Sequence, residues 1–212
     1  MGRQEYTEYK DQTYLDEFLS LKCSGDILNV LSPILGAQKE ISESMAVVKR
    51  LRKVLIKNPN KYTLYDLCAG NALTSAIAAH LFQLKHTYAF DIRKRDRAWD
   101  KIRGFTYIND NIHNPTMYNR ICNDSIIISV HPCTNLAKRV VDIYNQSKAG
   151  FLLVMPCCKG PTNINVPSII RERIGSYLTW SWDLASKCNG RVNMVIDNKC
   201  LSPKNCLIIA RK

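Results

Sequence analysis

Residues 65–75 read YDLCAGNALTS, and this stretch decides the fold that we expect. It joins an expected strand, Thr63–Leu67, to an expected helix, Ala72–Leu84. The turn between them carries small side chains, which let a ligand approach the backbone closely, and Gly70 tolerates unusual backbone angles. Neither familiar phosphate-binding pattern fits, because G-x-x-x-x-G-K-[ST] is absent and G-x-G-x-x-G keeps a single glycine. The stretch therefore predicts a ligand-binding turn at the carboxyl end of a strand.

The sequence around this turn alternates between strand and helix patterns. Runs such as IIISV at 126–130 and FLLVM at 151–155 are typical of parallel strands that are covered on both faces. The expected strands are Thr63–Leu67, Thr87–Asp91, Phe105–Ile108, Ser125–Val130 and Gly150–Met155. The expected helices are Ala72–Leu84, Arg95–Lys101, Thr116–Cys122 and Thr134–Gln146. This succession predicts a doubly wound α/β sheet.

The two ends of the chain depart from this alternation. After an expected helix at 168–187, the strands Arg191–Ile196 and Asn205–Arg211 are separated by only eight residues, which predicts an antiparallel hairpin. The first 60 residues carry helical patterns at 14–21, 26–35 and 37–56, the last with one apolar stripe and basic residues on its other faces. We therefore expect an N-terminal helical cap over 1–60 and an α/β domain over 61–212.

The net charge indicates a class of binding partner, and the cysteine content indicates a cellular compartment. The chain has 30 Lys and Arg against 18 Asp and Glu, a net charge of +12, which favours a nucleic-acid partner, with a solvated basic surface as the alternative. Nine cysteines without a secretory leader pattern indicate reduced thiols in the cytoplasm. No C-x-x-C pair is present, so we expect no metal site, and no apolar run is long enough to span a membrane.

Acidic residues end the next two expected strands. Asp91 lies twenty-five residues after Asp66, in the range for a carboxylate that accepts both hydroxyls of a ribose. Asp110, Asn111 and Ile112 follow the third strand, where a polar side chain could receive an adenine amino group. Each aspartate could instead be a helix cap or a turn residue, so the ordered set carries the interpretation.

In this order of motifs the sequence resembles the class I S-adenosylmethionine-dependent methyltransferases over residues 37–212. The resemblance implies a Rossmann-like seven-stranded sheet, mostly parallel with the last strand antiparallel, and S-adenosylmethionine as cofactor. It places the methionine side of the cofactor at Asp66–Ala72, the ribose at Asp91 and the adenine at Asp110–Ile112. The family loop usually has three glycines, where this chain has Cys68, Gly70 and Ala72. The implied cofactor-binding residues are Asp66, Cys68, Ala69, Gly70, Asn71, Ala72, Asp91, Ile92, Asp110, Asn111 and Ile112.

A narrower resemblance, to the methyltransferase-domain-32 group, comes from four short motifs. They are Lys39-Glu40, Asp66–Gly70, His131-Pro132-Cys133 and Pro156-Cys157-Cys158. The group includes a tRNA 2′-O-methyltransferase family and a domain of a glutathione-S-transferase-C-terminal-domain protein. The tRNA enzyme's added zinc-finger regions have no counterpart here.

The last two of these motifs bring His131, Cys133, Cys157 and Cys158 to the ends of neighbouring strands, so we expect the four side chains to converge near the methyl group of the cofactor. His131 could be a general base in an acceptor pocket, and Cys133 or Cys157 a nucleophile, so His131 and Cys133 are the candidate catalytic residues. The four side chains could also bind a metal, or the cysteines could simply pack as small hydrophobic residues. The amine-methylating signature Asp/Asn-Pro-Pro-aromatic is absent.

These observations predict direct methyl transfer to a macromolecular acceptor, RNA (tRNA or rRNA) in first place. A protein acceptor, or a non-catalytic RNA-binding module with the same fold, remains the alternative, and the sequence indicates no oligomeric state. The basic residues of segment 93–103 could guide an RNA backbone or cover a solvated helix, and the tryptophans could stack bases or pack. Lys39 could reach the methionine carboxylate.

Overall fold

The computed structural model describes residues 12–33 and 36–212, and its centre is a seven-stranded sheet. The strands are β1 (Thr63–Leu67), β2 (His86–Asp91), β3 (Phe105–Asn109), β4 (Ser125–Val130), β5 (Phe151–Met155), β6 (Arg191–Ile196) and β7 (Cys206–Arg211). They lie in the order β3-β2-β1-β4-β5-β7-β6. β7 is antiparallel to both neighbours, and β1–β5 pair in parallel. The expected mostly parallel sheet with a reversed last strand is confirmed.

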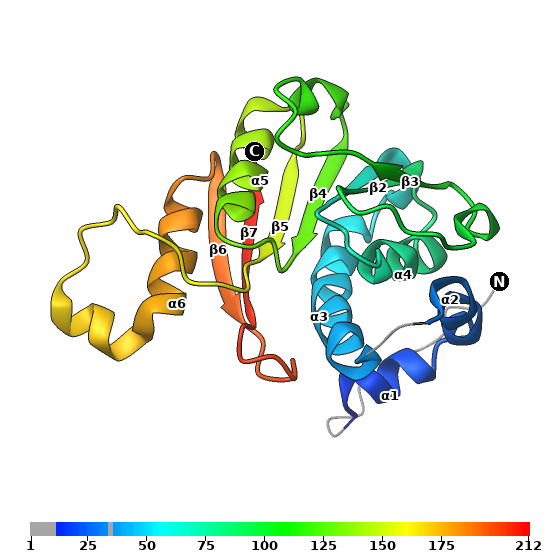
Figure 1. Cartoon of the computed structure of the whole chain (residues 1–212), viewed down its shortest axis with the longest axis horizontal. Helices are drawn as coiled ribbons and strands as arrows, with labels where there is room; N and C mark the ends of the chain where they lie inside the picture. The colour runs from blue at the N-terminus through cyan, green and yellow to red at the C-terminus, as the bar shows by residue number, and fades with distance from the viewer. Residues whose placement is uncertain (1–11, 34–35) are drawn as a thin grey trace.

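Helices cover both faces of this sheet (Figure 1). They are α1 (Tyr14–Leu19), α2 (Ser24–Leu31), α3 (Ala37–Leu55), α4 (Leu73–Leu81), α5 (Asn135–Gln146) and α6 (Ser168–Ser186). Successive strand residues point to opposite faces. On β4, for example, Ile126 and Ile128 join the α1–α4 cluster, whereas Ile127 joins the α5–α6 cluster. This two-sided burial explains why the strands read as continuous apolar runs.

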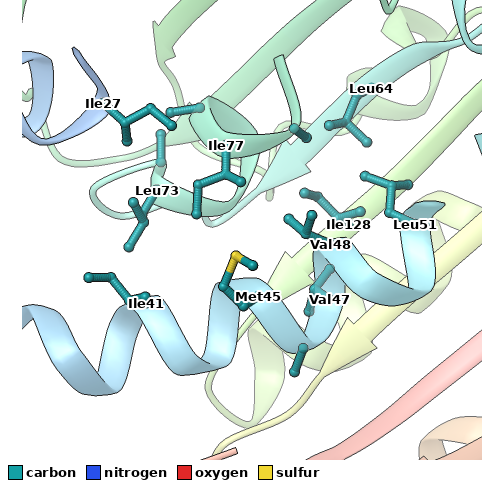
Figure 2. Close-up of a cluster of buried hydrophobic side chains, with 14 of the residues drawn as sticks. Ile27, Ile41, Met45, Val47, Val48, Leu51, Leu64, Leu73, Ile77 and Ile128 are labelled. Carbon is teal, nitrogen blue, oxygen red and sulfur yellow. The ribbon is translucent and has the colours of Figure 1, made fainter. Parts of the chain in front are cut away.

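The apolar stripe of α3 is buried as its period predicts. Ile41, Met45 and Leu51 are at most 5 % exposed and meet α4 and the sheet, as Figure 2 shows. Helices α1–α3 share one hydrophobic cluster with the sheet. The domain boundary at residue 60 stays a prediction, and residues 1–11 and 34–35 of the expected cap lie outside the described residues.

Two predicted helices are wrong. The segments 95–101 and 116–122 each contain a single 3-10 turn, at Trp99–Lys101 and Met117–Arg120 respectively. Another 3-10 turn, Pro59–Lys61, precedes β1. Neither segment carries an apolar stripe of several turns, so packing does not offset the cost of starting a helix. In the first, Trp99 instead stacks on Tyr107 at 4.8 Å between ring centroids, which fixes the loop against β3.

Three further helices are shorter or less regular than expected, and one of them, α4, ends at Leu81 rather than at Leu84. Helix α2 ends at Leu31 rather than at 35, because the residue before a proline is driven into an extended conformation, and Ser32 precedes Pro33. Helix α6 is interrupted at Gly175, whose φ of 75° and ψ of 164° are not helical. Within the described residues, no helix has the length and hydrophobicity needed to cross a membrane.

Candidate active site

The candidate site lies at the carboxyl edge of the sheet, where the parallel strands β1–β5 end. A cavity of about 310 Å³ opens there between the β1–α4 loop, the amino-terminal half of α3 and the end of β4. Its lining consists of Gly36, Lys39, Glu40, Glu43, Ser44, Cys68, Ala69, Gly70, Leu73, Thr74, Arg93, Val130 and His131. The predicted residues Cys68, Ala69, Gly70 and His131 line it, as does Lys39.

The β1–α4 loop is held in a left-handed conformation at alternate positions. Cys68, Gly70 and Ala72 have φ angles of 61°, 58° and 55°. They are the positions of the three glycines that the resemblance to class I methyltransferases implies, and left-handed angles are those that glycine adopts most easily. A non-glycine residue in this region costs on the order of 1 kcal/mol. The loop is anchored by the Ala69 amide, which donates to the Phe90 carbonyl at 2.9 Å.

The Asp91 carboxylate faces this loop from the end of β2. Its Oδ2 accepts from the Gly70 amide at 2.8 Å, and its Oδ1 accepts from the Arg93 amide at 2.9 Å and from Arg93 Nε at 3.0 Å. Burial acts to raise the pKa of Asp91, but the hydrogen bonds outweigh burial, so the pKa lies below its ordinary value. The Arg93 side chain is 60 % exposed, so it can leave the carboxylate without disturbing the core. Ile92, between them, is exposed.

Asp110 and its neighbours lie beside Asp91 but outside the cavity lining. The Asp110 amide donates to the Asp91 carbonyl at 3.0 Å, and its carboxylate forms an ion pair of 2.6 Å with Arg120. Asn111 is exposed, whereas Ile112 is buried in the α5–α6 cluster. The structure thus brings the two acidic strand ends together.

Asp66 and Asn71 have other surroundings. Asp66 is only 2 % exposed and does not line the cavity. Burial raises its pKa to about 7, against the opposing effect of hydrogen bonds with Ser75 at the start of α4. The Asn71 amide donates to both oxygens of Glu40 at 3.1 Å and so ties the loop to α3. Ala72 is fully buried beneath the loop.

The most unusual feature of the cavity is the contact between His131 and Glu43. His131 Nε2 and Glu43 Oε1 lie 3.4 Å apart, are both buried, and complete no hydrogen bond. Burial lowers the pKa of His131 to about 4, although a hydrogen bond to the Lys204 backbone opposes this, so the imidazole is neutral near pH 7. Burial raises the pKa of Glu43, against the opposing effect of Lys39.

Sequence reasoning did not find Glu43. The residue is one helical turn after Lys39, and the two side chains form an ion pair of 3.7 Å. That i, i+4 spacing next to the Lys39-Glu40 motif was the available signal. Its burial depends on the β4–α5 loop, which the sequence of α3 does not reveal.

The four residues of the HPC and PCC motifs do not meet at one point. The imidazole of His131 faces the cavity, but its carbonyl oxygen faces the thiols of Cys157 at 3.5 Å and Cys133 at 3.8 Å. Cys133, Cys157 and Cys158 gather together, and none of them lines the cavity. The expectation that all four side chains converge is therefore wrong, because the backbone of His131 separates its ring from the thiols.

Comparison with known proteins identifies the family. The model of the methyltransferase-domain-32 family matches residues 37–163, so the chain belongs to this family. A search of the curated proteins gave no match. A SAM-dependent methyltransferase from Aquifex aeolicus has a similar structure, with a TM-score of 0.52 and 14 % identity, over 87 % of this chain and 95 % of that chain.

Two other solved structures share the fold. The methyltransferase domain of bacterial CtHen1-CN has a TM-score of 0.54 and 12 % identity, over 80 % of this chain and 100 % of that chain. The CurJ carbon methyltransferase has a TM-score of 0.55 and 16 % identity, over 93 % of this chain and 63 % of that chain. The protein is a class I methyltransferase that uses S-adenosylmethionine.

The residues present fit that cofactor chemically. The site offers a carboxylate suited to a vicinal diol, a loop of small side chains, and two buried polar atoms, Glu43 Oε1 and His131 Nε2, that lack hydrogen-bond partners. Buried polar atoms without partners are rare in proteins and often mark a site that a ligand completes.

Proposed function

We propose that the protein methylates RNA, either tRNA or rRNA, in the cytoplasm. The observation that supports this proposal is a run of basic residues that begins at the cavity lining. Arg93 lines the cavity, and the segment 93–103 also contains Lys94, Arg95, Arg97, Lys101 and Arg103 against only two aspartates. Most of this segment is exposed. Such a strip can neutralise phosphates and guide a backbone to the site.

We assign the cofactor-binding roles by chemistry. Asp91 binds the ribose hydroxyls after its exposed partner Arg93 moves aside, and the loop Cys68–Gly70 faces the methionine portion. Lys39 is suited to the methionine carboxylate, and Asp110 to the adenine side. When bound, S-adenosylmethionine supplies an electrophilic methyl group on a sulfonium sulfur.

His131 is the candidate general base of this proposal. Its neutral imidazole lines the cavity and can accept a proton from an acceptor atom that loses one on methylation. Glu43, 3.4 Å away, would stabilise the resulting imidazolium and acts as a positioning residue. Cys133 lies outside the cavity, so the geometry favours His131 over Cys133 for this role.

The acceptor class can be tested with the purified protein and S-adenosylmethionine labelled in its methyl group. Separate reactions with total RNA and with total cellular protein should label RNA, and ribonuclease should release that label. Label in polypeptide alone would overturn the RNA proposal in favour of a protein acceptor. Cofactor binding without label in either fraction would favour a non-catalytic RNA-binding module.

A pair of charge reversals tests the basic segment. Lys94→Glu with Arg103→Glu changes two exposed cations that do not line the cavity. RNA labelling should fall by about tenfold or more, with cofactor affinity unchanged, because phosphate contacts supply much of the affinity for RNA. Lys57→Glu, an exposed residue after α3, is the matched control and should leave labelling unchanged.

A further inference from the structure

Three cysteine thiols from two loops meet at the carboxyl edge of the sheet, beside the cavity. Cys133 lies between β4 and α5, and Cys157 and Cys158 follow β5 directly. The Sγ atoms of Cys133 and Cys157 are 3.3 Å apart, and those of Cys157 and Cys158 are 3.2 Å apart. All three Sγ atoms lie within 4.8 Å of one another, and no other such group of three Cys, His, Asp or Glu ligands occurs among the described residues.

The surroundings of the thiols suit a cation better than an apolar core. Cys133 is exposed and Cys157 and Cys158 are partly exposed, so an ion can reach them, whereas Cys188 and Cys206 are buried in the usual way of packed cysteines. The nearby polar group is the His131 carbonyl, which contacts two of the thiols.

We propose that Cys133, Cys157 and Cys158 bind one zinc ion as three thiolates, with the fourth coordination position open toward the solvent. Zinc–sulfur bonds of about 2.3 Å in a tetrahedral site place sulfur atoms about 3.8 Å apart, so small side-chain rotations would form the site. Three thiols lose three protons to the solvent as the ion binds, and the three thiolates with Zn²⁺ carry a net charge of −1.

The ion would join two loops that belong to different strands. It would tie the β4–α5 loop, which carries His131, to the segment that leads from β5 to α6. This position is outside the cavity, so the site is distinct from the cofactor-binding residues. C-x-x-C spacing does not reveal it, because the ligands are 24 residues apart and are brought together by the pairing of β4 with β5.

The test uses the full chain without a metal-binding tag, purified with reductant, stripped by a chelator and reloaded with Zn²⁺. Elemental analysis should give about one zinc per chain after desalting. Alkylation of the native protein followed by mass spectrometry should show that zinc protects these three cysteines and leaves the exposed Cys122 reactive. Co²⁺ in place of zinc should give thiolate charge-transfer absorption.

Matched variants locate the site. Cys133→Ser and Cys158→Ser should each reduce bound zinc at least tenfold, whereas Cys122→Ser, an exposed thiol outside the cluster, should retain it. Circular dichroism checks that the variants fold. If a variant does not fold, the protection of the three cysteines from alkylation in the wild-type chain tests the proposal without it.

Three results would overturn the proposal. The first is wild-type protein that keeps no zinc after reloading. The second is zinc that stays bound in both variants. The third is a disulfide between Cys133 and Cys157 in protein kept under reductant, since that would assign the short sulfur–sulfur distances to a redox pair instead.

Discussion

The two ends of the candidate active site hold their acidic side chains in opposite ways. At the end formed by β2 and β3, Asp91 and Asp110 each have an exposed arginine partner, Arg93 or Arg120. At the end formed by α3 and β4, Glu43 is buried with Lys39 3.7 Å from its Oε1, yet neither this oxygen nor Nε2 of the neighbouring His131 has a hydrogen bond. A ligand must therefore compete at the first end with hydrogen bonds that the two arginines already donate. At the second end it can supply a missing partner.

The largest expected effect comes from Asp91→Ala, which removes the carboxylate at the first end. S-adenosylmethionine affinity, measured by isothermal titration, should fall by about 100-fold or more, because hydrogen bonds to a charged group contribute about 1.5–3 kcal/mol each. Asp100→Ala, at an exposed acid on the following loop, should bind normally. Full affinity in Asp91→Ala would show that the ribose is bound elsewhere.

His131→Gln tests the buried end through the pH dependence of stability. Burial lowers the folded-state pKa of His131 from 6.5 to about 4, so between these pH values the unfolded chain binds more protons. Wild-type protein should thus lose stability relative to His131→Gln as the pH falls from 7 to 4. The loss should be about 2–3 kcal/mol. Urea unfolding of both proteins at each pH measures this loss. If the two unfolding free energies changed in parallel with pH, the imidazole would be exposed to water rather than buried.

Glu43→Gln separates stability from activity at the same end. The neutral amide removes a buried charge whose Oε1 lacks a hydrogen bond, and it loses only an ion pair with the exposed Lys39, so the unfolding free energy should rise by about 1 kcal/mol. Methyl transfer should slow by about tenfold, mainly in kcat, with a shifted pH profile, because the imidazolium of His131 loses its stabilising charge. Glu172→Gln, on the exposed start of α6, is the control. Unchanged kcat and pH profile would remove Glu43 from the mechanism.

Arg93→Ala should have the smallest effect on cofactor affinity, and it should increase that affinity rather than decrease it. An exposed ion pair is worth about 0.2–1 kcal/mol, so freeing Asp91 should tighten cofactor binding by up to about fivefold. The same titration measures it. Weaker binding would mean that Arg93 itself contacts the cofactor, and the contrast between the two ends would then be incorrect.

Much of the fold could be predicted from sequence because strand burial leaves a local pattern. Thr63–Leu67, Ser125–Val130 and Arg191–Ile196 begin and end in the structure as the sequence predicts. The turn of small residues at 68–72 was predictable, and so were unusual angles at Gly70, but the left-handed angles at Cys68 and Ala72 were not, because both carry a Cβ that disfavours them. Segments without a period, such as 95–101 and 116–122, were predicted as helices and are loops with one short turn.

The candidate site was only partly predictable for a related reason. Asp91 is a strand-end residue, and its neighbour Gly70 belongs to the adjacent strand end, so the order of elements brings them together. Asp66 fits the same pattern but points into the protein, because its side chain is directed toward α4 rather than the cavity. The direction of a single side chain depends on packing around it.

Periodicity, segment length and side-chain size were enough to predict the sheet, its reversed last strand and the turn of small residues after β1. The contact of Glu43 with His131, and the grouping of three cysteines beside the His131 carbonyl, can be seen only in the folded chain. The physical reason is that such contacts join residues that are far apart in the chain. Their distances are set by how α3 and the ends of β4 and β5 pack, and no local pattern records that packing.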